Sequence, residues 1–142
     1  MEKRNQKKNQ RGFTLVEIMI VLAIVGMLFS FVGVKVINQY KKAKIDGAKI
    51  QIASYQQALQ SYYLAHNYYP SSEQGLEALI SKPTVGKIPN NYPEGGYFNK
   101  KELVKDPWSN PYRYECTDNQ NFTISSDGPD GEQGTEDDIK SE

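Results

Sequence analysis

The residues best suited to chemistry gather near the end of the chain, from Ser126 to Asp138, where acids alternate with glycines. Hard cations such as calcium take about six to eight oxygen ligands, from carboxylates and backbone carbonyls, and glycines let the backbone turn carbonyls inward. The segment is not an EF-hand, because Pro129 and Gly131 stand third and fifth counted from Asp127, where oxygen side chains belong. The residues alone leave two interpretations open, a calcium-binding loop and a solvated acidic tail.

The chain offers little that could carry out catalysis. It has one histidine, His66, and one cysteine, Cys116, which excludes an internal disulfide and a zinc site made only of these ligand types. His66 falls in a helical pattern, and Cys116 falls in an expected strand, where a buried cysteine is more usual than a nucleophile. No P-loop pattern is present, so energy for any movement must come from a separate ATPase. We expect a protein that is not an enzyme.

Apart from the acidic cluster, one other acid stands out: Glu17 is the only charged residue in the apolar segment Phe13–Val34. As a helix the segment would run roughly 33 Å, enough to cross a bilayer core of about 30 Å. A carboxylate inside a membrane is costly unless it is neutralised or paired, so acids in this setting are functional by default. We expect Glu17 to find a cationic partner; the alternative is that it snorkels at the membrane edge.

Basic residues before the apolar segment predict its orientation. Five of them, Lys3, Arg4, Lys7, Lys8 and Arg11, stand against Glu2 alone. This pattern predicts a cytoplasmic N-terminus and a body on the other side of the membrane. The segment is too long for a conventional secretory signal, and the domain is too small to surround it as a core helix, so a retained anchor is favoured. The formal net charge of zero argues against nucleic-acid binding.

The helical pattern continues beyond the anchor. Apolar positions recur at alternating steps of three and four, at Ile45, Ala48, Ile52, Tyr55, Leu59, Tyr62 and His66. This spacing places one stripe on a helix face, and no proline interrupts the chain from Phe13 to Tyr69. We expect one long helix to about residue 66, ended by Pro70, and a short helix over Glu73–Ser81 capped by Ser71 or Ser72.

Prolines and glycines break the remaining chain into short pieces. Short strands are expected at Tyr97–Phe98, Tyr112–Glu115 and Phe122–Ser125. A small antiparallel sheet would cover the stripe on the long helix, which gives one α+β domain on a helical stalk.

The stretch from Arg11 to Glu17, RGFTLVE, resembles the class III signal of type IV pilins and pseudopilins. The resemblance implies that a prepilin peptidase cuts between Gly12 and Phe13 and N-methylates Phe13. It also implies that the new amino group pairs with Glu17 of a neighbouring copy and so sets the register of a helical homopolymer. Such a cut would leave 12 basic against 16 acidic side chains.

The rest of the chain resembles the major pseudopilins of type II secretion systems. The matching motifs are Tyr69-Pro70, Glu73–Leu79, Lys82-Pro83, Gly95–Tyr97, Asp106–Trp108 and Asn110–Tyr112. One departure is Val34, where the family usually has a proline in the membrane helix. The resemblance implies a type IV pilin-like α+β fold with a removed leader (1–12), a membrane-spanning polymerisation helix (13–36) and a periplasmic domain (37–142) that ends in a calcium loop (126–139).

The same resemblance implies a ligand set for calcium. Asp130 and Asp137 would bind through their side chains, and Asp138 would be an extra ligand. Asp127, Glu132 and Thr135 would contribute mainly main-chain or hydroxyl oxygens.

The function implied is that of a structural subunit of the periplasmic pseudopilus that drives export of folded proteins across the outer membrane. The protein would cross the inner membrane once, and its partners would be copies of itself, minor pseudopilins and the inner-membrane assembly platform. Two alternatives stay open: a subunit of a type IV pilus or DNA-uptake pseudopilus, and a membrane-anchored calcium-binding module that does not polymerise.

Overall fold

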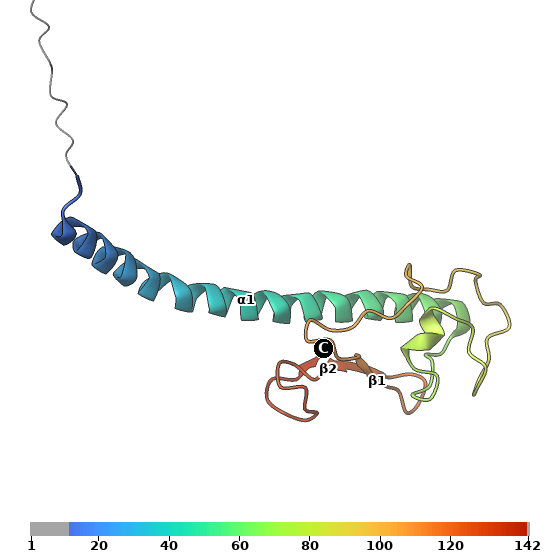
Figure 1. Ribbon diagram of the computed structural model, residues 1–142. Coiled ribbons are helices and arrows are strands. Elements are labelled where there is room, and N and C mark those ends of the chain that lie inside the picture. Colours follow the sequence, from blue (N-terminus) through green and yellow to red (C-terminus); the bar gives the residue numbers. More distant parts are fainter. Residues whose placement is uncertain (1–11, 142) are drawn as a thin grey trace, which may run out of the picture. The chain divides into compact units, whose positions relative to one another are not determined.

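The computed structural model describes residues 12–141, apart from the side chains of 30–34, so residues 1–11 of the expected leader and the side chain of Val34 lie outside the described residues. The chain divides into two compact units, Met1–Tyr40 and Lys41–Glu142. Its elements are α1 (Leu15–His66), the 3-10 helix η1 (Leu76–Leu79), β1 (Arg113–Glu115), β2 (Thr123–Ser126) and β3 (Ile139–Lys140) (Figure 1).

The helix α1 begins two residues later than expected, because Thr14 forms its N-cap. The hydroxyl oxygen of Thr14 accepts a hydrogen bond from the backbone N–H of Glu17 at 3.2 Å. An N-cap side chain of this kind satisfies one of the N–H groups that the first turn leaves without a partner. The end of α1 at His66 confirms the predicted end.

In the described part of the first unit, the large apolar side chains are exposed. Between residues 13 and 29 the exposed fraction runs from 40% for Val25 to 81% for Phe13 and Leu15. Within the described part of the chain, no helix is both long enough and apolar enough to cross a membrane.

The second unit has its core where the helical stripe meets the sheet. Ala48, Ile52, Tyr55, Leu59 and Tyr62 are buried, which confirms the predicted stripe. They form one cluster with buried residues of the later chain, among them Leu79, Phe98, Tyr112, Ile124 and Ile139. Figure 1 shows the C-terminal part of α1 lying across one face of the sheet, so the predicted α+β architecture is confirmed.

The sheet is antiparallel, in the order β1-β2-β3. Tyr114 pairs with Ile124, and Ser126 pairs with Ile139. Two expected strands are present with shifted bounds, whereas β3 was not expected. The strand expected at Tyr97–Phe98 is wrong: both backbone N–H groups donate to the carbonyl oxygen of Leu79, at 2.7 and 3.1 Å, so this segment closes against the end of η1.

The helix expected over Glu73–Ser81 is also wrong in its length, because only Leu76–Leu79 are helical and neither serine caps them. Ser71 instead closes the preceding turn, where its hydroxyl oxygen accepts from the backbone N–H of Gln74 at 3.3 Å. Ser72 ties this turn to the sheet: its hydroxyl accepts from the backbone N–H of Cys116 at 2.7 Å and donates to the Cys116 carbonyl at 3.0 Å. Cys116 is buried, as expected, but its expected place in a strand is wrong, because β1 ends at Glu115.

His66 ends α1 inside a group of aromatic rings. Its Nε2 lies 2.6 Å from the hydroxyl of Tyr97, and its ring lies edge-on to Tyr62 with the centroids 4.6 Å apart. Burial lowers the pKa of His66, because the imidazolium form would lose water contacts here. His66 is therefore a packing residue at a helix end.

We expect the protein to lose stability as the pH falls from about 6.5, because the folded state holds His66 with a lowered pKa. Above the ordinary histidine pKa the imidazole ring is neutral in both the folded and the unfolded chain, so His66 does not lower the stability. As the pH falls from about 6.5 towards the lower folded-state pKa, the unfolded chain takes up the proton before the folded chain does, so unfolding is favoured. The test is to measure the urea midpoint of unfolding at several pH values between 7.5 and 5. The midpoint of the natural chain should fall as the pH falls, and the midpoint of His66→Gln should change less. An equal slope in both proteins would contradict the assignment to His66.

Candidate functional site

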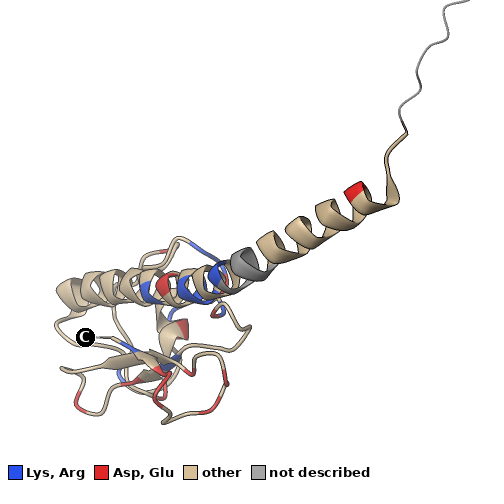
Figure 2. Cartoon of the chain, turned by 90° about the vertical axis from the view of Figure 1, so that its left-hand side faces the viewer, with Lys and Arg blue, Asp and Glu red and all other residues tan. Residues whose placement is uncertain are grey.

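Glu17 is an exposed acid of the first unit. Gly12 and Phe13 are exposed, and the carboxylate of Glu17 is exposed and makes no hydrogen bond or ion pair with the described residues. Glu17 is the one charged residue in the sequence of the apolar segment Phe13–Val34. Figure 2 accordingly shows an acidic position, in red, near the start of α1 in a stretch that is otherwise coloured as uncharged. A lone carboxylate among exposed apolar side chains is suited to pairing with a cation from another molecule.

Six acidic residues of the second unit lie on the loop 127–138, which joins β2 to β3. The pairing of Ser126 with Ile139 closes the base of this loop. Gly128 has a φ of 66°, and a Cβ at this position would collide with the carbonyl oxygen of Asp137. Only glycine therefore lets these two ends of the loop come so close together.

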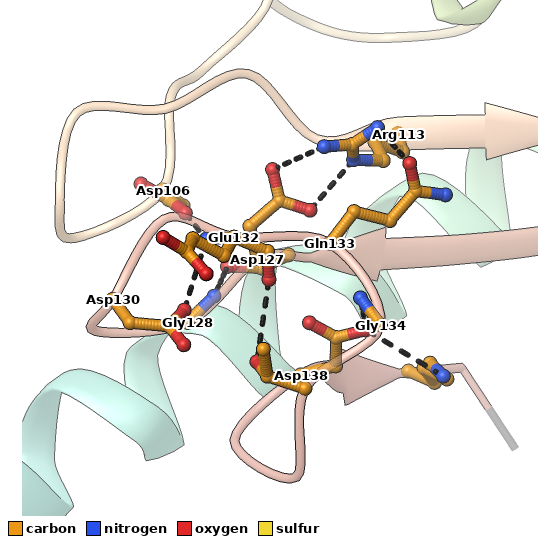
Figure 3. A network of polar contacts seen from close by, with 12 residues as sticks. Asp106, Arg113, Asp127, Gly128, Asp130, Glu132, Gln133, Gly134 and Asp138 are labelled. Atoms are coloured by element: carbon orange, nitrogen blue, oxygen red, sulfur yellow. Dashed lines mark hydrogen bonds and ion pairs between the residues drawn. The ribbon is translucent and has the colours of Figure 1, made fainter.

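Arg113, at the start of β1, holds the first half of this loop. Its Nε and Nη2 donate to Oδ1 and Oδ2 of Asp127, at 2.6 and 2.8 Å. Its Nη1 donates to the side-chain oxygen of Gln133 at 2.6 Å. Figure 3 shows the guanidinium group directed at both carboxylate oxygens of Asp127. This paired geometry raises the pKa of Arg113, with the hydrogen bond to Asp127 as the largest cause.

The other predicted ligands make local contacts within the loop. Oδ1 of Asp130 accepts from the backbone N–H of Glu132 at 2.9 Å. The hydroxyl of Thr135 donates to Oδ1 of Asp137 at 2.6 Å, and this bond lowers the pKa of Asp137. Oδ2 of Asp138 accepts from the backbone N–H of Gly134 at 2.9 Å.

The loop has oxygen chemistry suited to a hard cation, although its carboxylates are spread out. Among residues 12–141, no three His, Cys, Asp or Glu side chains come together in a way that could hold a metal ion. Oδ1 of Asp138, however, is buried without a hydrogen-bond partner. A buried oxygen of this kind is costly, and a bound cation would satisfy it.

Asp106, which the sequence analysis quoted only as part of a family motif, is a further polar residue near the loop. Its buried carboxylate accepts three hydrogen bonds: from the backbone N–H groups of Trp108 and Asn110, at 3.0 and 2.7 Å, and from the hydroxyl of Ser126 at 2.7 Å. Since Ser126 directly precedes the acidic loop, Asp106 supports the base of the loop. An Asp before Pro107 is a known turn signal and could have indicated this role.

Arg113 and Gln133 were missed for a different reason. Arg113 lies 14 residues from Asp127 and 20 from Gln133 in sequence. No local pattern links positions so far apart, because the antiparallel register of β1 and β2 creates the contact.

We expect Asp106→Ala to destabilise the protein by about 2–4 kcal/mol, since it leaves the Ser126 hydroxyl and two backbone N–H groups without their acceptor. The matched control is Asp118→Ala, which removes an exposed carboxylate that also accepts backbone hydrogen bonds, from Gln120 and Asn121. Urea unfolding of the full chain in detergent would measure both. Equal losses in the two variants would contradict a special role for the buried Asp106.

Comparisons with known proteins agree with this picture along nearly the whole chain. Residues 35–142 match the family model for protein G of the type II secretion system (T2SS). Residues 7–33 match the prokaryotic N-terminal methylation motif.

Two similar relatives carry the same description, type II secretion system core protein G. The protein from Aeromonas hydrophila is 44% identical over 135 residues, which cover 94% of this chain and 93% of the relative. The protein from Pectobacterium carotovorum subsp. carotovorum is 47% identical over 131 residues, which cover 92% and 83%. The chain is also similar to the crystal structure of the major pseudopilin from the type 2 secretion system of enterohaemorrhagic Escherichia coli. That match has a TM-score of 0.65 and 38% identity, and it covers 73% of this chain and 90% of the other.

Proposed function

Because the chain belongs to the type II secretion system protein G family, and is therefore a structural pseudopilin subunit and not an enzyme, we propose that it polymerises into a periplasmic filament that drives export of folded proteins across the outer membrane. The observation that carries this proposal is the exposed carboxylate of Glu17, which has no partner in the described chain and lies among exposed apolar side chains. Such a surface suits a lipid environment and contact with further copies of the same helix.

The proposal includes processing and anchoring of the N-terminus. A prepilin peptidase would cut between Gly12 and Phe13 and N-methylate Phe13, which the match of residues 7–33 to the methylation motif supports. The anchor would cross the inner membrane once, with the N-terminus in the cytoplasm, as the five basic residues before it favour. Minor pseudopilins and the inner-membrane assembly platform would be the other partners.

Glu17 would set the subunit register. In the proposed filament its carboxylate pairs with the amino group of Phe13 on a neighbouring, axially shifted copy. In a low-dielectric setting this pairing removes the cost of two isolated charges.

We expect Glu17→Ala to abolish filament assembly while leaving the fold of the second unit unchanged, because the register-setting charge is lost. Co-expression with the secretion machinery, followed by shearing and immunodetection of filaments, would measure assembly. Asp46→Ala, which removes an exposed carboxylate of α1 outside the apolar segment, is the matched control and should assemble normally. Normal filaments from Glu17→Ala would contradict the register role of Glu17, whereas the absence of filaments from the natural chain would favour a membrane-anchored module that does not polymerise.

The acidic loop would bind calcium. Asp130 and Asp137 would supply side-chain oxygens, the buried oxygen of Asp138 would gain a partner, and Glu132 and Thr135 would contribute main-chain or hydroxyl oxygens. Asp127 would contribute through its main chain, because Arg113 already occupies both of its carboxylate oxygens. An ion that binds only the folded state stabilises it, which would replace the disulfide that a single cysteine cannot form.

We expect removal of calcium by a chelator to lower the thermal midpoint of the full chain in detergent by several degrees. A ligand at a hundred times its dissociation constant stabilises by about 2.7 kcal/mol, which produces a shift of this size. Asp130→Ala should unfold like the chelated protein with or without calcium, whereas Glu136→Ala, which removes an exposed acid outside the proposed ligand set, should keep the response. An unchanged midpoint after chelation would rule out a structural role for calcium.

A further inference from the structure

Arg113, at the start of β1, is a cation that contacts the first half of the acidic loop. Together its three donated hydrogen bonds link the start of the segment 127–133, at Asp127, to its end, at Gln133. The side chain of Asp127 is only 10% exposed, and that of Arg113 is 37% exposed. A contact with a largely buried partner is screened less by water than an ordinary surface ion pair.

The position of the Arg113 side chain is set by the sheet and not by the loop. Arg113 pairs with Ser125 across β1 and β2, and Asp127 follows two residues later. The guanidinium group is thus presented by a fixed strand, and its planar fork matches a carboxylate in a way that an ammonium group cannot. Residues 127–133 therefore have a rigid point of attachment that does not depend on any bound ion.

Among the described residues, the second half of the loop has no attachment comparable to the contact between Arg113 and Asp127. Asp137 is held by Thr135, and the nearest cation to Asp138 is Lys140, whose Nζ lies 3.6 Å from Oδ2 and whose side chain is 58% exposed. Oδ1 of Asp138 is left buried without a partner. The charge of Asp127 is thus compensated within the chain, whereas Asp130, Asp137 and Asp138 lack a close, well-buried cation.

We propose that Arg113 is a positioning residue that keeps residues 127–133 in their bound-like arrangement when no ion is present, so that calcium has to order only residues 134–138. The part of this inference that concerns calcium affinity rests on the proposed calcium role of the loop. A loop already half in place loses less conformational freedom on binding, so Arg113 increases the affinity for calcium although it is itself positive.

The sign of the effect separates this role from simple electrostatics. If Arg113 acted only through its charge, its removal would take away a repulsion and calcium would bind more tightly. If Arg113 acts by positioning, its removal weakens calcium binding. Arg113→Lys should also weaken calcium binding, because lysine cannot form the bidentate contact with the Asp127 carboxylate.

The first experiment needs no calcium. The full chain in detergent, with a chelator present, is followed by hydrogen–deuterium exchange and mass spectrometry of peptides covering 127–133 and 134–138. Arg113→Gln and Arg113→Lys should speed exchange in 127–133 by roughly tenfold or more, as expected for the loss of a charge-assisted hydrogen bond. Lys140→Gln, which removes the other ion pair of the loop, should leave 127–133 unchanged. Exchange at the natural rate in Arg113→Gln would overturn the positioning role.

The second experiment measures calcium binding to the same proteins by titration calorimetry. Both Arg113 variants should raise the dissociation constant by roughly tenfold, the usual effect of losing a residue that orients metal ligands. Tighter binding to Arg113→Gln, or natural affinity in Arg113→Lys, would overturn the inference. A natural chain that binds no calcium, but whose 127–133 exchange rises in both variants, would contradict the calcium role and support the positioning role.

Discussion

The second unit depends on side chains to satisfy backbone groups that its short strands leave unpaired. The three strands span only Arg113–Glu115, Thr123–Ser126 and Ile139–Lys140, so much of the chain after α1 has no strand partner. Tyr55 shows how the problem is solved: its hydroxyl donates to the carbonyl of Val104 at 3.0 Å and accepts from the N–H of the same residue at 2.8 Å. Buried backbone groups must be paired, so such contacts fix the irregular segments on the helix.

This constraint explains which parts of the fold could be predicted from the sequence. The buried stripe from Ala48 to Tyr62 follows from helical spacing, which is a local property. The expected strand at Tyr97–Phe98 failed because its N–H groups found the carbonyl of Leu79 instead of a neighbouring strand. The strand β3 is only two residues long, which is too short to show any alternation in the sequence.

The two candidate functional regions also show which features can be predicted from sequence and which cannot. The residues around Glu17 form a compact motif whose spacing could be recognised, and the acidic residues of the loop were visible as a cluster. The arrangement of the loop was not visible, because Arg113 reaches Asp127 only through strand register and Asp106 reaches Ser126 across 20 residues. Sequence reasoning thus found the oxygen atoms but not the residues that hold them in place.

The contact between Ser72 and Cys116 has a practical consequence. Cys116 carries the single thiol of the chain and is 4% exposed, with both its backbone N–H and its carbonyl bonded to Ser72. A thiol reagent can therefore reach it only when the sheet separates from the turn beneath it. The labelling rate of this one sulfur atom would report how often the domain opens, with no engineered probe, in a free subunit and in an assembled one.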